Sequence, residues 1–166
     1  MNKFLAICLS TLILALPATA SEPLDLKTEV IRMANACSEM IENNSKSLPD
    51  LRRYQYAKAG KGYKKAPYKS PILATGSSVK VVSRASKKAT SCTITVSSLF
   101  ANDARSLFKV YGSALEKRGY RPIQLRYKSG APKGGFQKGN LTFESRAVIS
   151  NLHGMGPLTI FIVHRK

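Results

Sequence analysis

The sequence contains few of the residues that catalysis and metal binding most often use. Among its 166 residues are two histidines, three cysteines and nine carboxylates, and it has no tryptophan. A protein zinc site usually takes three or four histidine, cysteine or carboxylate ligands, and glycosidase chemistry needs two facing carboxylates. No group of residues has the spacing of such a site. The sequence therefore predicts no metal, no cofactor and no catalytic residue.

Three residues keep a weaker hydrolase hypothesis open. His153 stands beside Gly154 in a predicted turn, where a histidine can act as a general base. Glu116 and Glu144 could form a carboxylate pair, although nothing in their spacing favours it. The glycine-rich stretch 130–140 lacks the Gly-Lys-Ser/Thr ending of a nucleotide-binding loop, so it predicts a hairpin loop.

The chain also has no apolar run long enough to cross a bilayer, which takes about 20 residues. Its longest, residues 4–16, follows Lys3 and precedes the small residues Ala18 and Ala20. This order is typical of a secretory signal peptide cleaved after Ala20. We therefore expect the mature protein, residues 21–166, to be a single domain that is periplasmic or secreted.

Cleavage would remove Cys8 and leave only Cys37 and Cys92. In an oxidising compartment two cysteines most simply form one disulfide. Cys37 falls on the apolar face of a predicted helix, and Cys92 shares the apolar phase of a predicted strand with Ile94 and Val96. The two patterns together predict a disulfide between the first helix and the sheet.

Negative charge is scarce after residue 50. Residues 21–50 hold six acids against three bases, whereas residues 51–166 hold three acids against 23 Lys or Arg. The formal net charge of the whole chain is +18. So positive a protein attracts anions and speeds their encounter, although its charge says nothing about its fold.

Hydrophobic periodicity predicts two helices and five strands. The order is α-β-β-α-β-β-β, which indicates an α+β fold with both helices on one face of a mainly antiparallel sheet of about five strands. Asn102 is predicted to cap the second helix and Gly119 to end it. The predicted helices cover residues 25–43 and 102–118, and the strands cover 78–84, 89–98, 121–127, 139–151 and 157–166.

Two segments show no sustained apolar period and are predicted as basic, aromatic-bearing loops. They cover residues 47–77 and 127–139, and loops of such length are usually functional or disordered. We expect residues 51–70 to contribute little to folding. The predicted anion-binding residues are Arg52, Arg53, Lys58, Lys61, Lys64, Lys65, Lys69, Lys128, Lys133 and Lys138. The predicted stacking residues are Tyr54, Tyr56, Tyr63, Tyr68 and Phe136.

This combination predicts an exported, non-enzymatic protein that binds an anionic partner. Lys and Arg neutralise phosphate, sulfate or carboxylate groups, and aromatic rings stack on bases or on the apolar faces of sugars. The partner would be a polyanionic polymer, with a glycan, a lipid headgroup or a nucleic acid as candidates. The alternatives are an inhibitor or accessory subunit that binds an acidic protein, and a small hydrolase that acts on an anionic envelope polymer.

The predicted disulfide can be tested by thiol titration of the exported, mature protein. After unfolding without reductant, we expect no free thiol, because Cys37 and Cys92 would be bonded to each other. Reduction before titration should release two thiols per chain. Two free thiols in the unreduced protein would contradict the prediction.

Overall fold

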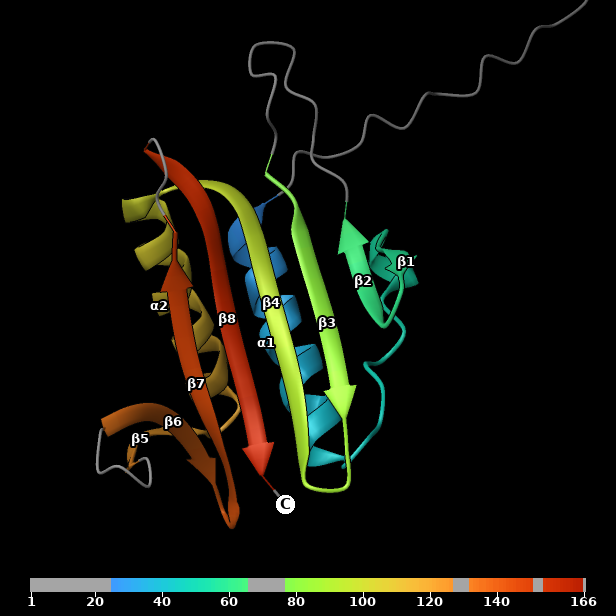
Figure 1. Cartoon of the computed structure of the whole chain (residues 1–166), viewed down its shortest axis with the longest axis vertical. Coiled ribbons are helices and arrows are strands. Elements are labelled where there is room, and N and C mark those ends of the chain that lie inside the picture. The colour runs from blue at the N-terminus through green and yellow to red at the C-terminus, as the bar shows by residue number, and fades with distance from the viewer. Residues whose placement is uncertain (1–24, 66–76, 127–131, 151–153, 166) are drawn as a thin grey trace, which may run out of the picture.

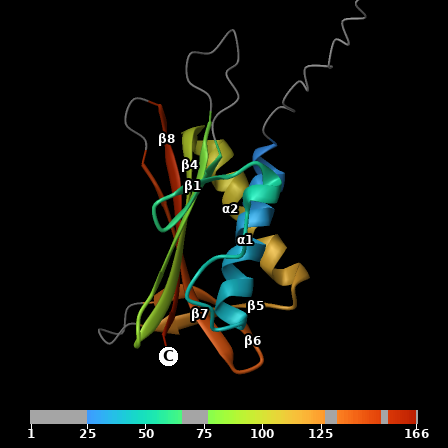
Figure 2. The same cartoon turned by 90° about the vertical axis from the view of Figure 1, so that its right-hand side faces the viewer.

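The computed structural model describes residues 25–65, 77–126, 132–150 and 154–165, and these form two layers (Figures 1 and 2). One layer is a single antiparallel sheet, and the other consists of two α-helices packed on one face of that sheet. The α+β class and the placement of both helices on one face are confirmed. The predicted number of strands was too low, because the sheet has eight.

The elements follow one another as α1, a 3₁₀ turn, β1 to β4, α2 and β5 to β8. The helices are α1 Leu26–Glu42 and α2 Ala101–Lys117, and the 3₁₀ turn is Arg52–Tyr54. The strands are β1 Ala57–Ala59, β2 Gly62–Lys65, β3 Val79–Ala85, β4 Ala89–Phe100, β5 Arg121–Arg126, β6 Pro132–Lys138, β7 Leu141–Ile149 and β8 Met155–Arg165.

The sheet consists of two four-stranded halves that meet at its centre. Its order is β1-β2-β3-β4-β8-β7-β6-β5, so each half is a meander and the last strand of one half pairs with the last strand of the other. Strands β3, β4, β7 and β8 are long, whereas β1 and β2 form a short hairpin at one edge. The β5–β6 hairpin forms the other edge and curls toward the helices (Figure 2).

Three strands were missed because they lie in the segments predicted to be loops. Strands β1 and β2 fall within 47–77, and β6 falls within 127–139. Each is short or rich in lysine and glycine, and in two of them the apolar alternation rests on one aromatic residue. That residue is Tyr63 in β2 and Phe136 in β6, and both side chains are buried. The five predicted strands match β3, β4, β5, β7 and β8 within a few residues at each end.

The residues at the helix ends agree with the sequence predictions except at one cap. The Asp25 carboxylate accepts a hydrogen bond from the Lys27 backbone N–H at 3.1 Å and so caps α1. After α2, Gly119 takes the left-handed conformation with φ +85°. The predicted cap Asn102 is wrong, because Phe100 occupies that position and Asn102 lies within the first turn.

The core fills the space between the helices and one face of the sheet. Alternate residues of the central strands point into it, among them Ile94, Leu158 and Ile160, which have no more than 1% of their surface exposed. The Ser145 hydroxyl in β7 lies 3.1 Å from the Tyr111 hydroxyl in α2 within this layer. The residues that alternate with these in the central strands therefore point to the other face of the sheet, which neither α1 nor α2 covers (Figure 2).

The predicted disulfide is confirmed. Cys37 in α1 bonds to Cys92 in β4 across 55 residues of sequence, and their Cα atoms lie 5.8 Å apart. Both residues are buried. In the loop-closure model, a cross-link of this span stabilises the fold by roughly 4 kcal/mol.

None of the helices in the described ranges has the length and apolar character needed to cross a membrane. The predicted signal peptide, residues 1–20, lies outside the described residues.

A glycine in β2 allows this strand to approach β3. A Cβ atom added at Gly62 would lie 1.9 Å from the backbone oxygen of Val81, so Gly62→Ala should disrupt the pairing of β2 with β3. We expect a loss of about 2 kcal/mol or more in unfolding free energy, measured by urea denaturation.

Gly112→Ala is the matched control for this change. Gly112 lies inside α2, and an added Cβ would meet only the Phe136 ring, at 3.8 Å. In a helix interior alanine is more favourable than glycine by up to about 1 kcal/mol, so this variant should be slightly more stable than the wild type. Equal destabilisation of both variants would contradict the close approach at Gly62.

Candidate anion-binding face

Most of the rings predicted to stack on a ligand are buried in the core instead. Tyr56 is 2% exposed, Tyr63 is 6% exposed and Phe136 is 9% exposed, so none of the three offers a face to an external partner. Tyr54 is half-buried and has the guanidinium groups of Arg32 and Arg53 over its ring, at 4.2 and 4.8 Å. These positions correct the stacking hypothesis for the buried rings.

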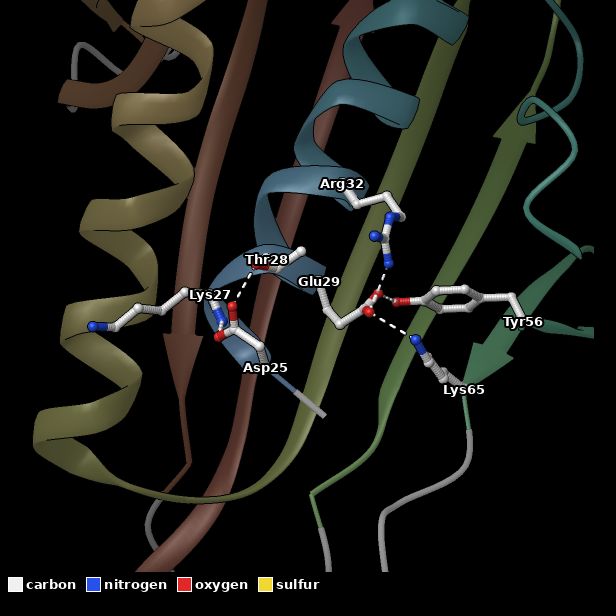
Figure 3. A network of polar contacts seen from close by, with 7 residues as sticks. All are labelled: Asp25, Lys27, Thr28, Glu29, Arg32, Tyr56 and Lys65. Carbon is white, nitrogen blue, oxygen red and sulfur yellow. Dashed lines mark hydrogen bonds and ion pairs between the residues drawn. The ribbon is translucent and has the colours of Figure 1, made fainter. Parts of the chain in front are cut away.

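A carboxylate in α1 explains why Tyr56 and Lys65 point inward. Glu29 is 4% exposed, and it accepts hydrogen bonds from the Tyr56 hydroxyl at 2.6 Å, from Lys65 Nζ at 2.8 Å and from Arg32 at 2.6 Å (Figure 3). We call these four residues the Glu29 cluster. It joins the first turn of α1 to both ends of the β1–β2 hairpin.

The Glu29 cluster fixes the charge states of its members. Burial raises the pKa of the Glu29 carboxyl, but the bonds from Lys65, Tyr56 and Arg32 outweigh burial and bring the pKa below its usual value. Burial and the bond to Glu29 both raise the pKa of Tyr56, which keeps its hydroxyl protonated as a donor. The positive charge of Lys65 is therefore neutralised inside the fold.

A second cluster of the same composition lies at the other end of α1. Glu42 accepts hydrogen bonds from Arg118 at 2.6 Å, from the Tyr120 hydroxyl at 2.9 Å and from Lys138 Nζ at 3.1 Å. We call this the Glu42 cluster. Burial raises the pKa of the Glu42 carboxyl, and the three donors together bring it below its usual value. Lys138, predicted to bind anions, thus fastens the β5–β6 hairpin to α1.

Most of the other predicted anion-binding and stacking residues fall into three groups. Arg52 pairs with Asp50 at 2.7 Å, and Lys133 pairs with Glu144 at 2.6 Å. Lys58 lies over the Tyr63 ring at 4.7 Å, and Lys61 is exposed in the β1–β2 turn. Three predicted residues, Lys69, Lys128 and Tyr68, lie outside the described residues.

Lys64 lies on the uncovered side of the sheet, opposite to the buried Tyr63. It pairs across the ladder with Lys80 in β3, so two cations stand side by side there. Further along β3, Arg84 is exposed in the same phase as Lys80. The residues of these strands that point away from the core therefore include cations, whereas the alternate residues are buried in the core.

The ladder registers arrange this uncovered side in rows across the central strands. One row runs Val82, Thr93, Phe161 and Arg146 from β3 to β7. The row beside it runs Lys80, Thr95, Thr159 and Val148, and the row on the other side runs Arg84, Ser91, Val163 and Glu144. Hydroxyl side chains thus occupy the middle of the sheet, with cations on both sides of them.

Five cations project from this surface: Lys64, Lys80, Arg84, Arg146 and Arg165. None of them forms an ion pair with any residue that the structure describes. The only carboxylate in the rows is Glu144, which is paired with Lys133. We call this surface, including the hydroxyl rows and Phe161, the open face.

The centre of the open face is a shallow hollow of about 480 Å³. Its floor is formed by β4 and β8, and it includes Thr93, Thr95 and the half-buried Phe161. Lys80 and Arg84 line one side of the hollow. On the other side the Arg146 guanidinium lies 5.2 Å from the centre of the Phe161 ring.

The structure separates the two carboxylates of the hydrolase hypothesis. Glu144 points to the open face, whereas Glu116 is exposed on α2 in the opposite layer. Glu116 and Glu144 therefore cannot face one substrate as a catalytic pair. His153 lies outside the described residues, and in the described part of the chain no three His, Cys, Asp or Glu residues come together as metal ligands.

Comparisons of the chain with protein-family models, with curated proteins and with solved structures gave no match.

Four residues of the open face, Lys80, Arg84, Arg146 and Phe161, are absent from the residues predicted from sequence. The strand periodicity that predicted the core also assigns these residues to the other face, because each lies one position from a core-facing residue. The pattern that indicates the open face is the recurrence of Lys, Arg, Thr or Ser at the positions of adjacent strands that point away from the core. It could have been found by collecting the outward residues of all predicted strands.

Replacing Glu29 with glutamine tests the Glu29 cluster. Its carboxyl has a lower pKa in the folded protein than its ordinary 4.5, so its stabilisation is present above about pH 4.5 and is lost as pH falls through the folded pKa. At pH 7, Glu29→Gln should lower the unfolding free energy by about 1–3 kcal/mol. We expect the difference from the wild type, measured in urea at several pH values, to shrink below about pH 4.5.

Glu39→Gln is the control, since Glu39 is exposed on the same helix. It should leave the stability at pH 7 within about 0.5 kcal/mol of the wild type. A loss for Glu29→Gln that stays constant down to pH 3 would contradict the role of the ionised carboxylate.

Proposed function

We propose that this protein is an exported, non-enzymatic binder of an anionic polymer and that the open face is its binding surface. The observation that carries the proposal is the set of five cations without ion-pair partners among the described residues, placed around a hollow lined by hydroxyl groups. The ligand is anionic in this proposal because the open face offers no unpaired carboxylate to a cation.

The spacing of these cations suits an extended ligand. Lys80 and Arg84 are four residues apart along β3, about 13 Å, and Arg146 lies three strands away, about 14 Å across the sheet. A single small anion could not contact all three. A chain with repeated negative groups could cross the sheet and meet several cations together, as polyanions do when they bind basic surfaces.

The middle of the open face favours an acidic glycan among the anionic polymers. Thr93 and Thr95 offer hydroxyl groups that can both donate and accept hydrogen bonds, which suits the hydroxyl groups of a sugar. The Ser91 hydroxyl donates to the Arg84 backbone oxygen at 3.3 Å and can accept a further bond. Phe161 adds apolar surface for a sugar, and the Arg146 guanidinium, which lies over the Phe161 ring, can bind a sulfate or carboxylate.

Export is part of the proposal and rests on two observations. Residues 1–20 have the pattern of a signal peptide, and a buried disulfide suits an oxidising compartment. Outside the cell membrane, a high positive charge would also raise the rate of encounter with acidic polymers.

The proposal is tested with the triple variant Lys80→Gln, Arg84→Gln and Arg146→Gln. Binding to a fluorescent heparin fragment, an acidic glycan, should weaken about tenfold or more at low salt, since each exposed contact contributes up to about 1 kcal/mol. The dependence of affinity on salt should also become shallower. Phe161→Ala should instead lower the affinity at every salt concentration.

The matched control removes three exposed cations away from the open face: Lys46→Gln, Arg105→Gln and Lys117→Gln. Both triple variants lose the same net charge, so a general attraction would weaken both equally. Equal losses would contradict the open face as the site. Tighter binding of single-stranded DNA than of a heparin fragment of equal charge would contradict the assignment to a glycan.

A further inference from the structure

We propose that the outer surface of the helix layer is a second binding site, which receives an acidic amphipathic helix of a partner protein. The site is the groove between α1 and α2, on the opposite side of the molecule from the open face (Figure 2). It is therefore independent of the polymer site, and a protein with both could hold a partner against the polymer.

The groove has a volume of about 460 Å³ and an apolar base. Ile31 of α1 is 38% exposed in it, beside the half-buried Val110 and the buried Ala114 of α2. An exposed isoleucine in a groove between two helices offers apolar surface that a partner can bury. Burial of such surface is the main favourable term in most protein associations.

The shape of the groove suits a helix. In Figures 1 and 2, α1 and α2 pack against each other and run in the same general direction, and residues of both helices line the groove. Its α2 wall consists of residues 106, 109, 110, 113, 114 and 117, which recur every three or four positions over about 16 Å. Ser106, Ser113 and Ala114 are small, and small side chains allow a third helix to pack at the usual interaxial distance of about 8–10 Å.

The charges on the rim specify an acidic partner. Lys27 on α1 and Lys109 and Lys117 on α2 line the groove, and none forms an ion pair with a described residue. No carboxylate lines it. Lys109 and Lys117 are two helical turns apart, about 12 Å. Acidic residues spaced by two turns along a bound helix would face them.

A helix fits these observations better than the polymer of the open face does. The groove has an apolar base and no aromatic ring, whereas the open face has a hydroxyl-lined hollow. Amphipathic helices bind such grooves with apolar residues at i, i+3, i+4 and i+7, while their flanking charges select the partner and its orientation.

The test uses a fluorescent 18-residue helical peptide with leucine and alanine at those apolar positions and glutamate on both flanks. We expect the peptide to bind the intact protein. The variant Lys109→Glu with Lys117→Glu should weaken binding at least tenfold. A second peptide carries lysine in place of the glutamates on the flank that faces α2. It should bind this variant with restored affinity, because the charges of the peptide and of α2 are then both reversed. Ser113→Tyr, which fills the groove without changing its charge, should also weaken binding at least tenfold.

The control variant Lys46→Glu with Arg105→Glu makes the same change in net charge outside the groove and should bind the peptide nearly as the wild type does. The proposal is wrong if both charge variants lose equal affinity, if the exchanged peptide recovers nothing, or if unstructured polyglutamate of equal charge binds as tightly as the peptide. Affinity for the heparin fragment is measured on the same variants. Its retention when peptide binding is lost would support two separate sites.

Discussion

The structure depends most on where the chain places its few carboxylates, and Glu29 is the clearest case. Buried at the start of α1, it holds Tyr56, Lys65 and Arg32 together, while Glu42 at the end of α1 makes the same set of contacts with the other edge of the sheet. The two edge hairpins thus attach to one helix. Apart from the buried rings of Tyr56 and Tyr63, the β1–β2 hairpin has little apolar surface, so the Glu29 cluster adds to its attachment.

This use of carboxylates also decides where positive charge stays available. Lysines that meet Glu29, Glu42 or Glu144 are neutralised within the fold, so composition alone overstates the number of cations open to a ligand. Among the cations without such partners in the described residues, five project from the open face and three line the helix groove. The two proposed binding surfaces follow from the pairing of charges more than from their total.

The sequence was sufficient to predict the elements in which apolar residues recur regularly over a long segment. It predicted both helices, five of the eight strands and the disulfide, because buried residues recur in them at fixed intervals. It could not predict that Lys65 and Lys138 bond to carboxylates far away in the sequence, since such contacts exist only in three dimensions. The same limit applies to Tyr56 and Tyr63, for which composition predicts ligand stacking, whereas both rings lie in the core.

The disulfide has a mechanical consequence for a molecule with a surface on each layer. Cys37 lies between Glu29 and Glu42 along α1, so this helix is fastened to the sheet at its start, its middle and its end. Sliding of the helices over the sheet would stretch a covalent bond as well as two charged clusters. A load applied between the two faces would therefore pass through α1 into β4, at the centre of the sheet, rather than shear the layers apart.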